Sequence, residues 1–79
     1  MPHPTTEEEW QTRASAFIKA KMKECGVTYA ELIKRLEKHG FKETEASITM
    51  KLKRGTFAAT FLLATLAALE LEGMRLEEL

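Results

Sequence analysis

Cysteine, proline and glycine are scarce in this 79-residue chain, which holds one Cys, two Pro and four Gly residues. A single cysteine excludes a disulfide within the chain and favours a reducing compartment, so we expect a cytoplasmic protein. The first residues show neither the basic nor the apolar region of a signal peptide. Cys25 closes an apolar helical stripe, and we expect its thiol to be buried by packing.

Long apolar runs are also missing. The longest, residues 57–69, spans 13 residues and includes Thr60 and Thr65. A membrane-spanning helix needs about 20 such residues, so we expect a core helix here and no membrane span. No stretch alternates apolar and polar residues over the length of a strand, and no repeat or linker divides the chain. These observations predict a single all-α domain.

The residue sets of common catalytic and metal sites are absent too. The sequence has no Ser/His/Asp or Cys/His set, no glycine-rich phosphate loop and no cluster of metal-ligand residues. His39 lies at an expected helix end, where it interacts favourably with the helix dipole, and His3 lies in the N-terminal tail. We therefore expect no enzymatic activity, no cofactor, no metal and no small-molecule substrate.

Net charge is zero overall but is unevenly distributed. Residues 28–55 hold seven Lys and Arg against four Glu residues, a net charge of +3, whereas residues 56–79 carry −3. The basic middle segment weakly favours an anionic partner at the centre of the chain.

Helix boundary signals recur along the chain. Thr6 and Thr28 each precede a Glu by three residues, the spacing of a capping box, and Thr44 is a third N-cap candidate. Glycines supply the stop signals. The predicted helices run from Thr6 to Gly26, from Thr28 to Gly40, from Thr44 or Glu45 to Arg54, and from Thr56 to about Glu70, where Gly73 is the helix breaker; a short fifth helix follows.

The predicted fold is a compact all-α bundle of four main helices plus a short fifth, over residues 6–79, with residues 1–5 as a disordered tail. Apolar residues at helical spacing define its core. The fourth helix is apolar nearly all round, so we expect it to be central. The residues expected to be buried together are Phe17, Leu32, Leu36, Ile48, Leu52, Phe61, Leu62 and Leu66.

Four stretches resemble the lambda-repressor-like helix-turn-helix domains. Thr28-Tyr29-x-Glu31-Leu32-Ile33 is similar to their capped second helix, and Leu52-Lys53-Arg54-Gly55 is similar to the end of their recognition helix. Leu66-Ala67-x-Leu69 and Leu76-Glu77-Glu78-Leu79 resemble the fourth and closing helices. The resemblance covers about residues 14–79, implies a helix-turn-helix core over 28–55, and implies DNA as the partner and a role associated with transcription.

The connection between the second and third helices departs from this pattern. Residues 37–39 lengthen the second helix and residues 41–43 precede the next cap, so the turn is longer than usual. The strings Val27–Leu32 and Lys42–Ala46 also resemble a group of small, uncharacterised bacterial domains.

The third helix is the predicted DNA-contacting element. With Ile48 and Leu52 inward, steps of about 100° per residue turn Ser47 and Met50 toward base edges, while basic residues meet phosphates. Thr28 and Tyr29 provide a further phosphate contact at the start of the second helix. The predicted DNA-binding residues are Thr28, Tyr29, Lys42, Thr44, Ser47, Met50, Lys51, Lys53 and Arg54.

An alternative function, and the question of a homodimer, remain open from the residues alone. Met50 and Ala46 also suit a protein-contact patch, which gives a protein-interaction or dimerisation module of the same fold that does not bind DNA. One domain of this kind reads a half-site, which favours a homodimer. Its expected surfaces are the fourth helix, the fifth helix and the Trp10 end of the first.

Overall fold

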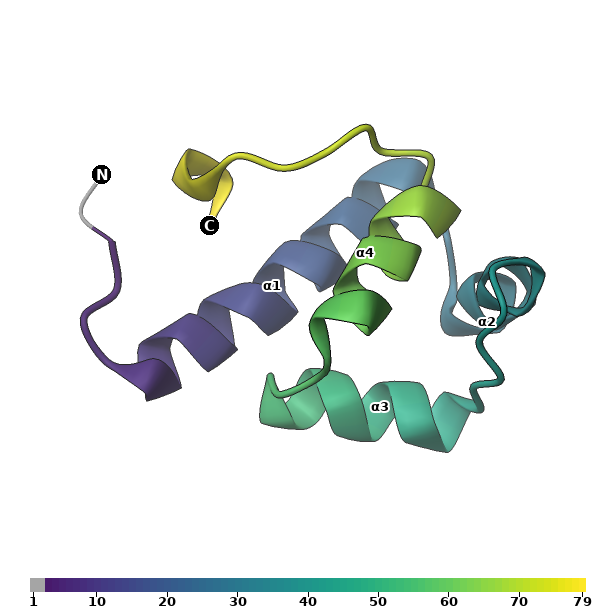
Figure 1. Ribbon diagram of the computed structural model, residues 1–79, viewed down its shortest axis with the longest axis horizontal. Helices are drawn as coiled ribbons and strands as arrows, with labels where there is room; N and C mark the ends of the chain where they lie inside the picture. Colours follow the sequence, from purple (N-terminus) through teal and green to yellow (C-terminus); the bar gives the residue numbers. More distant parts are fainter. Residues whose placement is uncertain (1–2) are drawn as a thin grey trace.

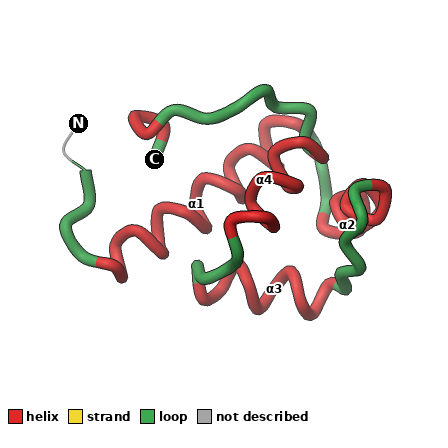
Figure 2. Tube along the Cα trace, in the orientation of Figure 1, coloured by secondary structure: helices red, strands yellow, loops and turns green. Residues whose placement is uncertain are grey.

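Helices account for all the regular structure in residues 3–79, the part of the chain that the computed structural model describes. Figure 1 shows their arrangement, and Figure 2 shows the short connections between them. The elements are α1 (Glu7–Cys25), α2 (Tyr29–Lys38), α3 (Glu45–Arg54), α4 (Ala59–Ala68) and a single 3-10 turn, η1 (Leu76–Glu78). The prediction of an all-α fold with four main helices and a short fifth is confirmed.

Threonine caps start the first three helices, as the sequence predicts. The Thr6 hydroxyl accepts from the Glu9 N–H at 3.1 Å, and the Thr28 hydroxyl accepts from the Glu31 N–H at 3.2 Å. Each bond satisfies one of the amide groups that the first turn of a helix leaves without a partner. In a full capping box the Glu side chain also accepts from the backbone N–H of the cap residue. The Glu31 carboxylate instead pairs with Arg35 at 3.4 Å.

The fourth helix is shorter than predicted at both ends. It begins at Ala59 rather than Thr56, and its N-cap, Ala58, offers no side-chain hydrogen bond. Residues 56–58 instead form the connection, in which the Phe57 ring packs against Phe61 at a centroid distance of 5.4 Å. The helix ends at Ala68, and Glu70 adopts φ 61°, so the break comes before Gly73.

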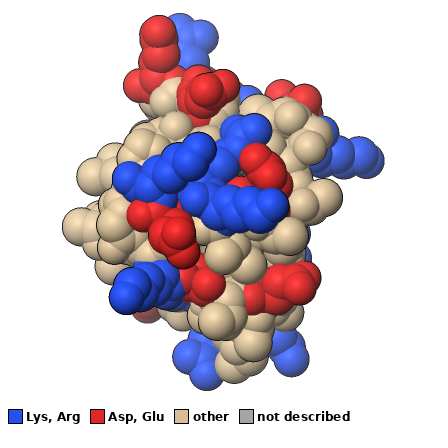
Figure 3. Space-filling view, turned by 90° about the vertical axis from the view of Figure 1, so that its right-hand side faces the viewer, with Lys and Arg blue, Asp and Glu red and all other residues tan. Residues whose placement is uncertain are grey.

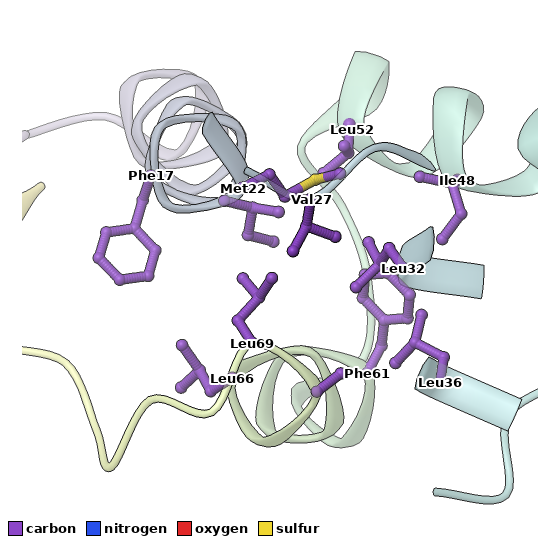
Figure 4. Close-up of a cluster of buried hydrophobic side chains, with 12 residues drawn as sticks. Phe17, Met22, Val27, Leu32, Leu36, Ile48, Leu52, Phe61, Leu66 and Leu69 are labelled. Carbon is purple, nitrogen blue, oxygen red and sulfur yellow. The ribbon is translucent and has the colours of Figure 1, made fainter. Parts of the chain in front are cut away.

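One core joins all four helices. Phe17 and Ile18 of α1, Leu32 and Leu36 of α2, and Ile48 of α3 lie within it. Figure 4 shows these helices' apolar side chains converging with those of α4. Seven of the eight residues predicted to form the core are buried, and Leu62 is half-buried at its edge.

Two predictions about burial are wrong. Cys25 is exposed, because it lies on the last turn of α1, where its thiol reaches only the Leu69 carbonyl oxygen at 3.8 Å. Helix α4 is not enclosed on every side, since Leu63 is 63% exposed. The helix contacts α2 on one side and leaves an uncharged face to solvent, so its apolar composition does not indicate full burial.

The C-terminal segment folds back along α1, as Figure 1 shows. The Arg13 guanidinium donates to the Leu79 main-chain oxygen at 2.8 Å, and Lys21 pairs with Glu78 at 2.9 Å. The hydrogen bond with Glu78 is the main reason that the pKa of Lys21 is raised, and the same bond lowers the pKa of Glu78. Of the predicted tail, Met1 and Pro2 lie outside the described residues, whereas Pro4 is buried.

Candidate nucleic-acid interface

Helix α3 lies at the edge of the molecule and is buried along one side only. Ile48 and Leu52 are 0% and 2% exposed, whereas Ala46, Met50, Lys53 and Arg54 on the opposite side are exposed. Figure 1 shows α2 nearly end-on while α3 lies across the view, so the two axes cross steeply. Steep crossing of two consecutive helices is typical of helix-turn-helix pairs.

Ser47 and Lys51 lie on the side of α3 that faces the preceding connection, residues 39–44. We call this side the Glu43 flank. The Ser47 hydroxyl accepts from the Thr44 N–H at 2.8 Å and lies 2.6 Å from a Glu43 carboxylate oxygen. The Thr44 hydroxyl in turn accepts from the Ser47 N–H at 3.0 Å. Ser47, predicted to read base edges, therefore uses its hydroxyl to close the start of α3.

Lys51 is engaged on the same flank. Its ammonium lies 2.5 Å from a Glu43 carboxylate oxygen and 4.7 Å from the centroid of the Phe61 ring. The Glu43 side chain is 6% exposed. Burial by itself raises the pKa of the Glu43 carboxyl, but hydrogen bonds from Lys51 and Ser47 outweigh burial and hold that pKa below its usual range. Lys51, predicted to meet phosphate, thus ties the 39–44 connection to α3 and α4.

The opposite flank of α3, which we call the groove flank, comprises Thr49 and Lys53. Both side chains line a groove of about 720 Å³ between α3 and α1, and the neighbouring Arg54 lines it too. Lys53 and Arg54 are exposed, and neither forms an ion pair within residues 3–79. These two predicted phosphate contacts are therefore available to a ligand.

The C-terminal end of α3 is held against α1 by two features that the sequence does not predict. The buried Ser15 hydroxyl donates to the Leu52 carbonyl at 2.5 Å. Gly55 adopts φ 70°, and a Cβ added there would lie 2.3 Å from the Gln11 carbonyl oxygen. A glycine stop after a helix is a local signal, but its contact with residues more than 40 positions away has no signature in the sequence.

The remaining predicted residues surround α3 without forming one cluster. Tyr29 is half-buried and lines the same groove, whereas the exposed Thr28 caps α2. Lys42 is exposed in the 39–44 connection. Figure 3, which looks onto the side bearing α2, shows Lys and Arg side chains together with acidic ones beside them. The cations on that side are therefore partly balanced by carboxylates.

Three large apolar side chains are exposed on the elements predicted to form a dimer surface. Leu63 of α4 is 63% exposed, Leu76 of η1 is 54% exposed, and Trp10 of α1 is 37% exposed. Trp10 also stacks with the His3 ring at a centroid distance of 6.2 Å.

Two further expectations from the sequence concern a membrane span and a metal site. Across residues 3–79, none of the helices is both long enough and apolar enough to cross a bilayer. Nor do three or more His, Cys, Asp or Glu side chains gather within that range in a way that holds a metal ion.

Comparison with known proteins places most of the chain in one family. Residues 10–74 match the model of a domain of unknown function, DUF6471, and the chain belongs to that family. The matched region contains α1 from Trp10 onward and all of α2, α3 and α4. No curated protein and no solved structure matches the chain.

Proposed function

We propose that this member of the DUF6471 family is a small cytoplasmic DNA-binding protein, associated with transcription, whose α3 enters the major groove. The observation that carries the proposal is the outer side of α3, where Lys53 and Arg54 are exposed and unpaired within residues 3–79. A helix that is fixed on one side and open on the other suits the major groove, which admits one α-helix.

Within this proposal, the residues of α3 divide the work by position. Lys53 and Arg54 neutralise phosphates, which supplies affinity without sequence preference. Met50, 44% exposed, and Ala46 face the base edges and contact them through apolar atoms. Tyr29, Thr28 and Lys42 flank the helix and contact the backbone further along the duplex. Ser47 and Lys51 are engaged with Thr44 and Glu43 and stabilise the fold rather than the complex.

A homodimer extends this proposal. A single domain of this size reads one half-site, and two-fold symmetric pairs read two. The uncharged exposed face of α4, with Leu63 at its centre, is the surface on which we propose that two copies meet. Two copies can pack there without bringing like charges together.

The second candidate is a protein-interaction module that does not bind DNA. The exposure of Met50 beside Ala46 favours it, because flexible methionines suit adaptable protein contacts. The acidic residues near the start of α3 favour it as well, since Glu45 is exposed there and repels phosphate. Such a module recognises its partner through apolar contact, so its affinity depends little on salt.

Titration of random-sequence duplex DNA at low salt separates the two candidates. The DNA-binding proposal predicts an affinity that falls steeply between about 50 and 200 mM salt. Replacing Lys53 and Arg54 together by Ala lowers the log–log salt slope by about two, one for each lost contact. The matched control is Lys38→Ala, which removes an exposed cation from a different pocket, between α2 and α4. Absence of binding below about 100 μM, the weak end of non-specific affinity, overturns the proposal in favour of the module.

A further inference from the structure

The groove between α1 and α3 is a sizeable hollow, and none of the predicted DNA-binding residues lies on its α1 side. Its α1 wall includes Lys19 and Thr12, its α3 wall includes Thr49 and Lys53, and Tyr29 lies at the start of α2. At about 720 Å³, its volume falls within the range of small-ligand sites, roughly 300–1,000 Å³.

The charges that line the groove come from both walls and are mostly positive. Lys19 lines it from α1, Lys53 and Arg54 line it from α3, and Glu8 is the one carboxylate among the lining residues. Lys19 is exposed and, like Lys53 and Arg54, forms no ion pair within residues 3–79. Lys21 and Lys51, by contrast, each have a Glu partner within 3 Å. Within residues 3–79, the three cations around the groove are thus among those that form no ion pair.

Hydroxyl groups complete the set of donors. Two of them are already engaged, because Ser15 donates to Leu52 and Thr12 donates to the Glu8 carbonyl at 3.1 Å. The Tyr29 and Thr49 hydroxyls make no hydrogen bond within the described part of the chain. Two or three cations with hydroxyl donors around a solvent-open hollow form a donor set suited to phosphate oxygens.

We infer that the groove between α1 and α3 is a phosphate-binding site, in which Lys19 acts from one wall together with Lys53 and Arg54 from the other. The inference rests on the proposed function only for the source of the phosphate. In a DNA complex it is a backbone phosphodiester beside the duplex held by α3. A free phosphorylated small molecule presents the same oxygens and fits the same donors.

The test follows amide signals of the full chain by ¹⁵N NMR during two titrations, one with random-sequence duplex DNA at low salt and one with inorganic pyrophosphate. Lys19→Ala is compared with Lys38→Ala, which removes the same charge from the pocket between α2 and α4. Both positions are exposed on helices, and Ala is a good helix former, so both variants keep the fold.

We expect the duplex to shift the amides of Lys19, Tyr29, Thr49 and Lys53. Lys19→Ala should weaken duplex binding by about threefold to tenfold and lower the log–log salt slope by about 0.9. Lys38→Ala should leave both the groove shifts and the slope unchanged. This result would identify the nucleic-acid backbone as the source of the phosphate.

The other outcomes separate the inference from the proposed function. If the duplex binds and Lys19→Ala matches the native chain, the groove site is overturned while DNA binding stands. If the duplex does not bind but pyrophosphate shifts the groove amides and Lys19→Ala removes those shifts, DNA binding fails and the groove is a site for a free phosphorylated ligand. If neither ligand shifts these amides, both are overturned.

Discussion

Helix α3 carries the same pair of residue types on its two flanks, a hydroxyl followed four residues later by a lysine. On the Glu43 flank, Ser47 and Lys51 both contact the Glu43 carboxylate, at 2.6 and 2.5 Å. On the groove flank, Thr49 and Lys53 line an open hollow, and Lys53 has no ion pair within residues 3–79. What separates a structural lysine from one available to a ligand is thus the neighbour that the fold supplies.

The two flanks should therefore contribute differently to the stability of the fold. A buried carboxylate on the Glu43 flank needs both of its donors, because a buried charge without partners is strongly unfavourable. The groove flank places cations in water, where they stabilise the fold little. Changes at the Glu43 flank, and at the contact that positions α3 on α1, should therefore affect stability, whereas changes at the groove flank should affect binding.

The largest loss of stability is expected for Gly55→Ala, which disturbs the contact that sets the groove flank against α1. The new Cβ lies 2.3 Å from the Gln11 carbonyl oxygen, and the residue that carries it has a left-handed backbone conformation. Backbone strain and overpacking together should cost about 2–5 kcal/mol in the free energy of unfolding, measured by urea denaturation.

Gly40→Ala is the matched control for that change. Gly40 has φ 86° but open space around its Cβ position, so only the left-handed strain remains, about 1–2 kcal/mol. Equal losses for the two variants would show that the approach of Gln11 to Gly55 does not hold α3 in place.

A smaller loss is expected for Glu43→Gln, which breaks the Glu43 flank. Replacing the buried carboxylate weakens the hydrogen bonds from Ser47 and Lys51 and should cost about 1–3 kcal/mol at pH 7. The pKa of Glu43 is lower in the folded chain than its ordinary value of 4.5. Its stabilising contribution is therefore complete above about pH 4.5 and is lost as the pH falls through the folded-state pKa.

Denaturant melts at several pH values test this assignment. The native chain should lose stability progressively below about pH 4.5, and Glu43→Gln should show a shallower decline over the same interval. Glu78, whose pKa is also lowered, mainly by its hydrogen bond with Lys21, accounts for part of the remaining decline. An unchanged acid profile in Glu43→Gln would mean that the Glu43 pair adds nothing to the fold.

Much of the fold could be predicted from the sequence because its determinants are local. Thr28 and Thr44 cap the helices that follow them, and Gly26 and Gly55 end helices in the left-handed conformation. Apolar spacing located Leu32 and most of the core for the same reason. Burial at helix ends was less predictable, since Cys25 continues an apolar stripe beyond the point where another helix covers it.

The candidate site was less predictable because its residues are assigned by tertiary neighbours. Ser47 and Lys51 look like surface residues of a recognition helix, and their engagement depends on how the connection before α3 turns the Glu43 side chain toward both. Lys19 lies on α1, outside the predicted helix-turn-helix core of residues 28–55, so only the three-dimensional arrangement places it and Lys53 along the same groove. Ser15 meets Leu52 across 37 residues for the same reason.

The sharpest contrast in binding is expected for the two lysines that occupy equivalent places on α3, and the smallest effect on stability is expected for one of them, Lys53. Lys51→Ala removes an ion pair with a buried carboxylate and a contact with the Phe61 ring. It should cost about 1–3 kcal/mol of unfolding free energy, as Glu43→Gln does, because the buried carboxylate keeps only its Ser47 donor. Lys53→Ala removes an exposed, unpaired cation and should change stability by less than about 0.5 kcal/mol.

Measurement of both unfolding free energy and duplex DNA affinity for these two variants tests the central claim most directly. The account predicts a crossover at about 50 mM salt: Lys51→Ala is less stable but binds DNA as the native chain does, whereas Lys53→Ala is equally stable but binds about threefold to tenfold more weakly. If Lys51→Ala keeps its stability and weakens DNA binding as much as Lys53→Ala does, the two flanks do not differ in role and the account is wrong.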